Sequence, residues 1–217
     1  MIGIHEIFET MQCEGGNAGR PAIFVRLAGC NLWSGNEEKR SAGRGVCAKW
    51  CDTDFRLTER MTVEQVVDGV RAFDSRPAWV VITGGEPMLQ HAELVKLGSR
   101  LNWFDYNIAI ETNGTIAFDV NDFDHVCVSP KALVGVRGFN HIKQRQGDEL
   151  KIIVPLDPEI NIDDVRRLAD GFESVFVQPR DTGNDDENRA ALQTAIDIAN
   201  QNDWRVSIQY HKYIGIK

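Results

Sequence analysis

The sequence predicts an α/β fold, in which strands alternate with helices around a parallel sheet that is either open or closed into a reduced (β/α) barrel. Two observations support this prediction. Short apolar runs rich in Val and Ile recur along the chain, and most of them end against Gly, Pro or polar residues, as buried strands do. Stretches with a helical spacing of apolar residues lie between several of these runs.

A continuous apolar run of this length is typical of a strand that is buried on both faces. We expect strands at Pro21–Leu27, Trp79–Thr83, Tyr106–Glu111, His125–Ser129, Leu150–Val154, Val175–Gln178 and Arg205–Gln209.

Helical patterns cover the segments 63–73, 162–169 and 191–199. The first begins after Thr62-Val63-Glu64-Gln65, which has the pattern of a capping box. Two connections lack such a pattern. Thr115–Asp124 is short and polar, and Lys131–Glu149 carries glycines and basic residues, so we expect the second to be a loop that lies over a site.

The composition limits the possible classes of protein. The 217 residues are expected to form one domain, residues 1–217, with ordinary globular usage of 42% hydrophobic and 26% charged residues. A formal net charge of −8 argues against an extended nucleic-acid or membrane surface. No secretory signal or spanning apolar stretch is apparent, so we expect a cytoplasmic protein. Its odd number of cysteines, 5, argues against a disulfide framework.

The ends of the expected strands are unusually polar or rich in glycine. Because ligands of α/β folds bind at the carboxyl ends of the strands, several such ends that meet at one rim predict a site there. The ends in question are Gly29-Cys30-Asn31, Thr83-Gly84-Gly85-Glu86, Glu111-Thr112-Asn113-Gly114, Ser129-Pro130-Lys131 and Gln178-Pro179-Arg180-Asp181.

Cys30, Cys47 and Cys51 form the most specific group of residues in the chain. Three thiolates suit an iron–sulfur cluster or another soft metal. A structural zinc site needs a fourth ligand, and the next histidine, His91, lies in an expected helix, so the cluster is favoured. Three ligands leave one cluster iron open to bind a cofactor. Cys127 lies within an apolar run and is expected to be buried, and Cys13 is also treated as a non-ligand.

Other side chains near these strand ends also suggest a bound ligand, and three of them have a second, structural interpretation. Glu86 is able to accept hydrogen bonds from an ammonium group. Glu111 fits either the guanidine-like edge of a heterocycle or a salt bridge. Arg26 fits either a substrate carboxylate or a structural ion pair. Thr53, between two aspartates, fits either a magnesium site or the N-cap of a helix.

These motifs occur in the same order in one known family. The chain resembles the 7-carboxy-7-deazaguanine synthases, small members of the radical S-adenosylmethionine superfamily, over essentially its whole length. The resemblance rests on Cys30-Asn31-Leu32-Trp33, the cysteine loop of about residues 30–51, Cys51-Asp52-Thr53-Asp54-Phe55, Thr83-Gly84-Gly85-Glu86-Pro87, Glu111-Thr112-Asn113-Gly114, Ser129-Pro130-Lys131 and Gln178-Pro179.

The resemblance implies a modified, incomplete (β/α) barrel and an enzyme, a radical-dependent carbon–nitrogen lyase of queuosine and 7-deazaguanine biosynthesis. Such enzymes convert 6-carboxy-5,6,7,8-tetrahydropterin to 7-carboxy-7-deazaguanine with loss of ammonia. The implied cofactors are a 4Fe–4S cluster, S-adenosylmethionine and Mg²⁺. The implied partners are an electron donor such as a flavodoxin and a second copy of the chain in a homodimer. No side chain is assigned as an acid or base, because the cluster and the cofactor generate the radical.

The resemblance also assigns residues by position. The cluster ligands are Cys30, Cys47 and Cys51, and Thr53 is assigned to magnesium. S-adenosylmethionine is assigned to Trp50, Cys51, Asp52, Gly85, Glu86, Ser129, Pro130, Lys131, Gln178, Pro179, Arg180 and Asp181. The pterin is assigned to Met11, Gln12, Cys13, Glu14, Arg26, Thr83, Glu111 and Lys217, the last through its terminal carboxylate.

Five features depart from the family pattern. The interval between Cys30 and Cys47, Asn31–Val46, is longer than expected, and three residues rather than two separate Cys47 from Cys51. Cys13 stands in place of a glycine, Lys217 in place of a proline, and Arg180 in place of a smaller uncharged residue. These departures leave two alternatives open. One is a different radical enzyme, such as an activase that installs a glycyl radical on a partner protein, and the other is a zinc-stabilised module without enzymatic activity.

Overall fold

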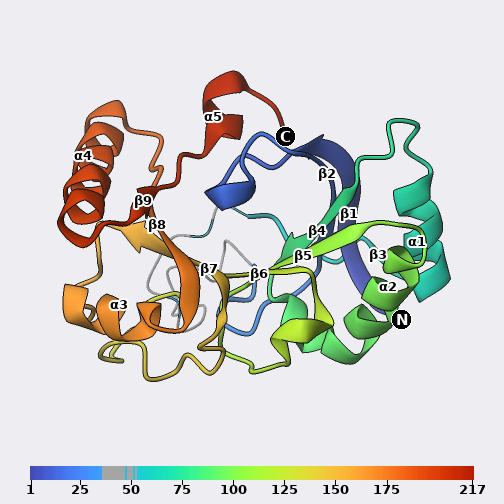
Figure 1. Ribbon diagram of the computed structural model, residues 1–217, viewed down its shortest axis with the longest axis horizontal. Helices are drawn as coiled ribbons and strands as arrows, with labels where there is room; N and C mark the ends of the chain where they lie inside the picture. Colours follow the sequence, from blue (N-terminus) through green and yellow to red (C-terminus); the bar gives the residue numbers. More distant parts are fainter. Residues whose placement is uncertain (36–46, 48–50, 52) are drawn as a thin grey trace.

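The computed structural model describes residues 1–35, 47, 51 and 53–217, and these residues form a mixed sheet of nine strands. The strand order is β3-β1-β2-β4-β5-β6-β7-β8-β9, so the sheet stays open, with β3 and β9 at its edges (Figure 1). The strands are β1 (Ile2–Met11), β2 (Pro21–Leu27), β3 (Glu59–Met61), β4 (Trp79–Gly84), β5 (Asn107–Thr112), β6 (His125–Val128), β7 (Gly147–Val154), β8 (Phe172–Pro179) and β9 (Arg205–Val206).

Every neighbouring pair of strands from β2 to β9 is parallel, and β1 runs antiparallel to both β2 and β3. The expected strands are thus confirmed, and the expectation of a purely parallel sheet is corrected at one edge. β1 was not expected because its sequence mixes charged and apolar residues and shows no continuous apolar run. β9 is shorter than the expected Arg205–Gln209 because the chain leaves the sheet at Ser207 and enters the last helix.

Four helices flank the outer side of the curved sheet, and a short fifth helix lies near the C-terminus (Figure 1). The three expected helices are present, and so is the helix expected around His91. The helices are α1 (Val63–Arg71), α2 (His91–Asn102), α3 (Ile162–Ala169), α4 (Asp185–Asn202) and α5 (Tyr210–Ile214), with 3₁₀ turns η1 (Gly15–Asn17), η3 (Pro87–Gln90) and η4 (Val120–Asp122). Within the described ranges, no helix has the length and apolar character to cross a membrane.

The capping chemistry fixes where two of these helices begin. The Thr62 hydroxyl accepts a hydrogen bond from the Gln65 backbone N–H at 3.2 Å, and the Gln65 side chain accepts one from the Thr62 N–H at 2.8 Å. This is the expected capping box of α1. Asn161 and Asp164 form the same reciprocal pair at the start of α3. Each pair satisfies two backbone donors that a helix N-terminus otherwise leaves unpaired.

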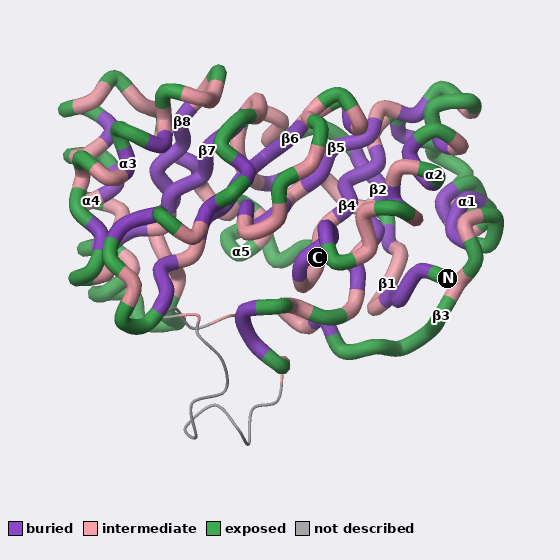
Figure 2. Tube along the Cα trace, turned by 90° about the horizontal axis from the view of Figure 1, so that it is seen from below, coloured by how far each residue is buried: buried purple, intermediate pink, exposed green. Residues whose placement is uncertain are grey.

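The hydrophobic core lies between the outer face of the sheet and the helices. Alternate residues of each strand point outward into it, and the middle strands are largely buried along their length (Figure 2). The outward set includes Ile23, Val25, Val80, Ile82, Ile108, Ile110, Leu150 and Ile152, which share one cluster with Val66, Leu94, Leu97, Val165, Leu168 and Ala195 of the helices.

The inner face of the sheet is different. It carries only a small apolar cluster, in which Ala22, Val81 and Ala109 are buried against Phe24 and Trp79. Farther along the strands its side chains are polar or charged. Because these residues alternate with the outward-facing ones, the same strands supply both the core and an interior polar surface. That surface forms the wall of the candidate site.

Candidate active site

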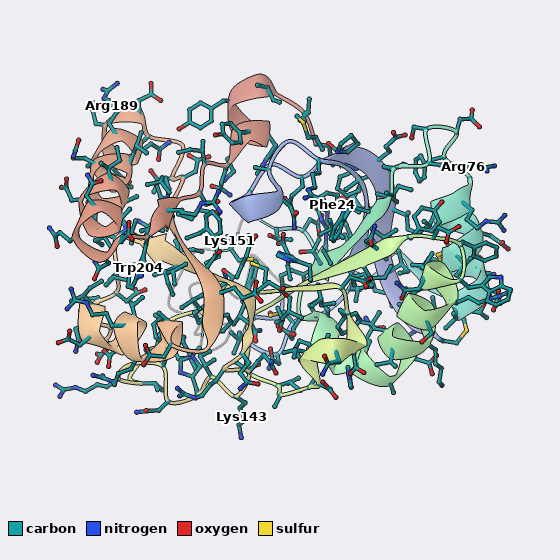
Figure 3. The ribbon with its side chains drawn as sticks, viewed as in Figure 1. Phe24, Arg76, Lys143, Lys151, Arg189 and Trp204 are labelled. Carbon is teal, nitrogen blue, oxygen red and sulfur yellow. The ribbon has the colours of Figure 1, made fainter. Side chains whose placement is uncertain are left out.

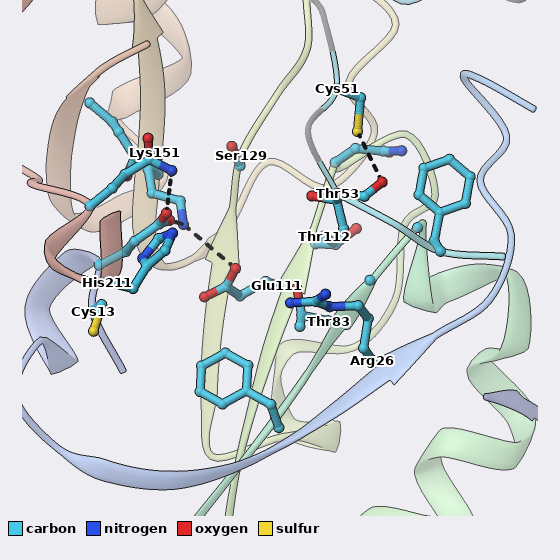
Figure 4. Close-up of a pocket in the computed structure, with 18 of the residues that line it drawn as sticks. Cys13, Arg26, Cys51, Thr53, Thr83, Glu111, Thr112, Ser129, Lys151 and His211 are labelled. Atoms are coloured by element: carbon cyan, nitrogen blue, oxygen red, sulfur yellow. Dashed lines mark hydrogen bonds and ion pairs between the residues drawn. The ribbon is translucent and has the colours of Figure 1, made fainter. Parts of the chain in front are cut away.

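A cavity of about 400 Å³ lies along the inner face of the sheet (Figure 4). Its lining comes from segments that are far apart in the sequence, which the sheet brings together. All eight residues that the resemblance assigns to the pterin line this cavity: Met11, Gln12, Cys13, Glu14, Arg26, Thr83, Glu111 and Lys217.

The three cysteines assigned to a cluster, Cys30, Cys47 and Cys51, line the same cavity, as does Thr53. The Leu32 backbone N–H donates to Cys30 Sγ at 3.4 Å, the kind of bond that stabilises a thiolate. Burial nonetheless raises the pKa of the Cys30 thiol. Within the described ranges, no three His, Cys, Asp or Glu side chains are close enough to hold a metal ion. The donor chemistry, three thiols that open onto one pocket, still fits an iron–sulfur cluster.

Two residues assigned to S-adenosylmethionine, Trp50 and Asp52, lie outside the described residues. The loop 131–146 contacts the cluster candidate Cys47, which forms an antiparallel bridge with Leu133. Lys131, at the start of that loop, lines the cavity and donates from Nζ to the Ser129 hydroxyl at 2.7 Å. The loop expected over Lys131–Glu149 is thus present but ends at residue 146, because Gly147–Glu149 already belong to β7, and it reaches the cavity through Lys131.

The Thr83-Gly84-Gly85-Glu86 motif joins the end of β4 to the cysteine-bearing segment. The Gly85 N–H donates to the Leu27 carbonyl oxygen at 3.3 Å, and the Glu86 N–H donates to the Gly29 carbonyl oxygen at 2.8 Å. A Cβ at Gly85 would lie 1.7 Å from that same oxygen, so only glycine fits there. Gly85, where the two segments approach so closely, also lines the cavity.

Glu86 itself is fully buried beside the cavity rather than in its lining. Its carboxylate accepts from the Met88 N–H at 3.0 Å, the Thr112 hydroxyl at 2.6 Å and the Asn113 N–H at 2.7 Å. Burial raises its pKa, and these bonds lower it in part. Glu86 therefore ties the ends of β4 and β5 together.

The remaining residues assigned to S-adenosylmethionine divide into two groups. Ser129, Lys131 and Gln178 line the cavity, and the buried Gln178 accepts a hydrogen bond from the Ser207 hydroxyl at 2.9 Å. The others lie beside it: Pro130, Pro179, Arg180 and Asp181. Asp181 forms an ion pair at 3.2 Å with Lys212, which does line the cavity.

Arg26 enters the cavity from β2 and points toward Thr83 and Glu111 (Figure 4). Its Nη1 pairs with Glu6 at 2.8 Å, and its guanidinium lies over the Phe8 ring at 5.2 Å. The structural ion pair, one of the two interpretations made for it from the sequence, is therefore present, and the pairing with a substrate carboxylate stays a prediction. The Nε atom is buried and has no hydrogen-bond partner among the described residues.

Lys151, in the middle of β7, is the residue of this site that the sequence analysis missed. Its side chain is only 5% exposed, and its Nζ lies 2.5 Å from Glu14 Oε2 and 3.6 Å from Glu111 Oε2. Gln209 and His211, near the start of α5, also line the cavity and were not expected there. The missed indication was the single charged residue inside the apolar run Leu150–Val154.

The electrostatics at this point are those of a buried ion cluster. Burial alone would lower the pKa of Lys151, but Glu111 and Glu14 raise it well above its usual 10.5. Burial would raise the pKa of Glu14, but Lys151 outweighs it and lowers that pKa to about 2. Cys127, buried beside Lys151 on β6, has a pKa raised by burial, which agrees with its expected role as a non-ligand. Cys13 is also buried, although it lines the cavity.

The comparisons with known proteins agree with this geometry. A 7-carboxy-7-deazaguanine synthase from Burkholderia multivorans is 39% identical to this chain over 227 residues, which cover 98% of each chain. A protein of the same name from Caulobacter vibrioides is 40% identical over 229 residues, again covering 98% of each chain. The crystal structure of QueE from Escherichia coli superposes with a TM-score of 0.70 at 26% identity, covering 96% of this chain and 93% of that one. No family model matches the chain.

Proposed function

The chain belongs to the 7-carboxy-7-deazaguanine synthase family, and we propose that it converts 6-carboxy-5,6,7,8-tetrahydropterin to 7-carboxy-7-deazaguanine by a radical ring contraction with loss of ammonia. One observation carries this proposal. A single cavity is lined both by three cysteines and by the carboxylates and guanidinium that a carboxylated pterin requires. The fold supports it too, since the open, incomplete barrel is shared with QueE.

The cofactors of this reaction are a 4Fe–4S cluster and S-adenosylmethionine. Cys30, Cys47 and Cys51 would hold the cluster through three of its irons. Bound together, the cluster and S-adenosylmethionine supply the radical that removes a hydrogen atom from the substrate. Of the residues of this chain assigned to S-adenosylmethionine, Cys51, Gly85, Ser129, Lys131 and Gln178 line the cavity. Their part is to bind and orient the cofactor next to the pterin.

The pterin would be held at its two ends. The guanidinium of Arg26, which lines the cavity, would pair with the substrate carboxylate, and charge-assisted pairing of this kind is strong and directional. Glu111 and Gln12, joined by a 3.0 Å hydrogen bond, would accept and donate at the aminopyrimidinone edge. The ring system would then lie between them, close to the cofactor.

Further parts of the proposal concern the surroundings of the site. We assign a magnesium ion to Thr53, because a hydroxyl that lines the cavity is a hard oxygen donor of the kind that Mg²⁺ prefers. The cluster needs a one-electron donor such as a flavodoxin. We also propose that the enzyme is a homodimer that works in the cytoplasm, where thiols remain reduced and free to bind iron.

The relatives favour the synthase over the two alternatives considered from the sequence, a glycyl-radical activase and a zinc-stabilised module. Arg26, Glu111 and Gln12 also give the cavity donors and acceptors that a small heterocycle needs. Neither alternative accounts for that set.

The test is an anaerobic assay with the reconstituted protein, dithionite, S-adenosylmethionine, Mg²⁺ and the carboxypterin. We expect the deazaguanine acid as the product, identified by mass spectrometry, from brown protein that holds about four irons per chain. Protein with that iron content that cleaves S-adenosylmethionine but yields no deazaguanine would refute the proposal. Colourless protein with one zinc per chain would favour the module.

A further inference from the structure

Lys151 is a buried lysine in the centre of a sheet, where an uncharged side chain is the rule. It lies between two carboxylates that come from different parts of the fold, Glu14 after β1 and Glu111 on β5. Figure 4 shows the ion pair between Lys151 and Glu111. Figure 3 shows the lysine in the interior of the molecule. Burying an ammonium ion is costly unless it is paired, and here two partners offset that cost.

Each of the two carboxylates is also held from its other oxygen. Gln209 Nε2 donates to Glu14 Oε1 at 2.8 Å, and Gln12 Nε2 donates to Glu111 Oε1 at 3.0 Å. An ionised carboxylate has about four lone-pair sites, so each group keeps acceptor capacity after these contacts. Both residues line the cavity, and the unused lone pairs are available to a ligand there.

The cluster of Lys151, Glu14 and Glu111 carries two negative charges and one positive charge. Without the lysine, two carboxylates would face each other in a buried site, and like charges in such a position raise the pKa of one of them strongly. A carboxyl that holds a proton has become a donor. Its O–H group then faces the N–H groups of an aminopyrimidinone edge, and two donors form no hydrogen bond with each other.

We propose that Lys151 is a positioning residue for the pterin: it keeps Glu14 and Glu111 ionised and oriented, so that both accept hydrogen bonds from the N–H donors of the aminopyrimidinone edge. The inference rests on the proposed function and adds to it, because nothing in the resemblance assigns Lys151. The lysine acts through the two carboxylates and does not touch the reacting atoms.

Other ionisable groups near the cluster must be considered before a pH effect is predicted. Cys127 lies beside Lys151, and His211 of α5 faces Glu14. His125 and Glu149 pair at 3.2 Å farther along the same face. All of these groups, and the substrate itself, are present in wild type and variant alike. At each pH, we therefore divide the dissociation constant of the Lys151→Met variant for the pterin by that of the wild type. This ratio reports the effect of the lysine on the carboxylate pair.

The test compares Lys151→Met with the wild type in the holoenzyme that holds S-adenosylmethionine but no reductant. The dissociation constant of the carboxypterin is measured by calorimetry at about pH 6 and about pH 9. We expect binding to weaken by about tenfold or more at the lower pH, because the carboxyl pair shares a proton there, and to recover at the higher pH. Lys143, at the periphery and exposed, gives the matched control Lys143→Met, which should match the wild type (Figure 3).

A double variant covers the case in which Lys151→Met does not fold. Lys151→Met with Glu14→Gln removes one charge of each sign and leaves Glu111 without a like charge beside it. This variant should bind the pterin more weakly than the wild type by the same factor at both pH values. A pH-dependent ratio in the double variant would overturn the inference.

In the single variant Lys151→Met, an unchanged affinity for the pterin would also overturn the inference. So would a loss of affinity that is the same at both pH values, because a lysine with a merely structural role predicts that result. Failure of the proposed function looks different. In that case the wild type would neither bind nor convert the carboxypterin at any pH.

Discussion

Glu111→Gln is the substitution that tests the pterin edge of the site most directly. Gln keeps the shape of the side chain and one oxygen acceptor but removes the charge. In the structure, Glu111 Oε1 accepts from Gln12 at 3.0 Å and Oε2 lies 3.6 Å from Lys151. The variant keeps the first contact if its amide oxygen faces Gln12. Its NH₂ group then faces the lysine and the ligand donors, where it has nothing to donate to.

The expected loss follows from that geometry. One charge-assisted hydrogen bond to the pterin disappears, and a hydrogen bond to a charged group contributes about 1.5–3 kcal/mol. Since each 1.4 kcal/mol is about a tenfold change in an equilibrium constant, KM for the carboxypterin should rise about 10- to 150-fold. Release of 5′-deoxyadenosine from S-adenosylmethionine in the absence of pterin should not change, because Glu111 has no assigned contact with the cofactor.

The assay is anaerobic product formation as a function of pterin concentration, with the iron content measured on the same samples. Glu64→Gln is the control, because Glu64 lies in an exposed ion pair with Arg100 at 3.1 Å and such pairs contribute little. A KM of Glu111→Gln within threefold of the wild type, with the iron content intact, would refute the assignment of Glu111 to the substrate.

Three other outcomes are expected. Cys51→Ser should hold fewer irons than the about four per chain of the reconstituted wild type, as iron analysis will show, because a hydroxyl is a poor ligand for this cluster. Gly85→Ala should weaken S-adenosylmethionine binding and lower the melting temperature, because its Cβ would meet the Gly29 carbonyl oxygen at 1.7 Å. Acid should destabilise the fold: the folded pKa of Glu14, about 2, lies below its ordinary 4.5, so its contribution is present above about pH 4.5 and is lost as the pH falls toward 2. Urea unfolding between about pH 5 and about pH 3 should show a flatter pH dependence in Glu14→Gln than in the wild type.

Matched variants separate these effects from general damage. Cys127→Ser removes a buried thiol that is not assigned to the cluster and should retain the iron. Gly98→Ala lies in α2, where the added Cβ finds its nearest neighbour at 3.8 Å, so it should not lower the melting temperature. Full iron in Cys51→Ser, or melting of Gly85→Ala at the wild-type temperature, would contradict the assignments made above.

Much of the sheet could be predicted because its strands are buried on both faces. β2 was predicted with its observed bounds, and β4 to β8 agree within a few residues, since Val- and Ile-rich runs persist where both sides of a strand exclude water. The edges could not be predicted in this way. β1 carries Glu6, Glu9 and His5 among its ten residues and β3 has three residues, so neither shows a clear apolar run. α5 has five residues, too few for helical periodicity to appear.

The assignment of the site depended on motifs at strand ends, and it missed residues inside strands. Arg26 and Glu111 were assigned because they belong to recognisable patterns. Lys151 was not, because a single charge within an apolar run reads locally as a solvent-facing residue. Its 5% exposed side chain and its ion pairs with Glu14 and Glu111, which only the folded structure brings together, show that it points into the interior.

The alternation of outward and inward side chains along each strand separates two kinds of mutational change. Outward positions such as Ile82 and Ile110 contribute to the core, whereas their neighbours Thr83 and Glu111 contribute to the pocket. Substitutions at distant, independent sites combine nearly additively. The strands thus allow the pocket to be diversified toward other heterocycles while the core that supports it stays constant, which makes the inward positions the natural targets of a substrate-specificity library.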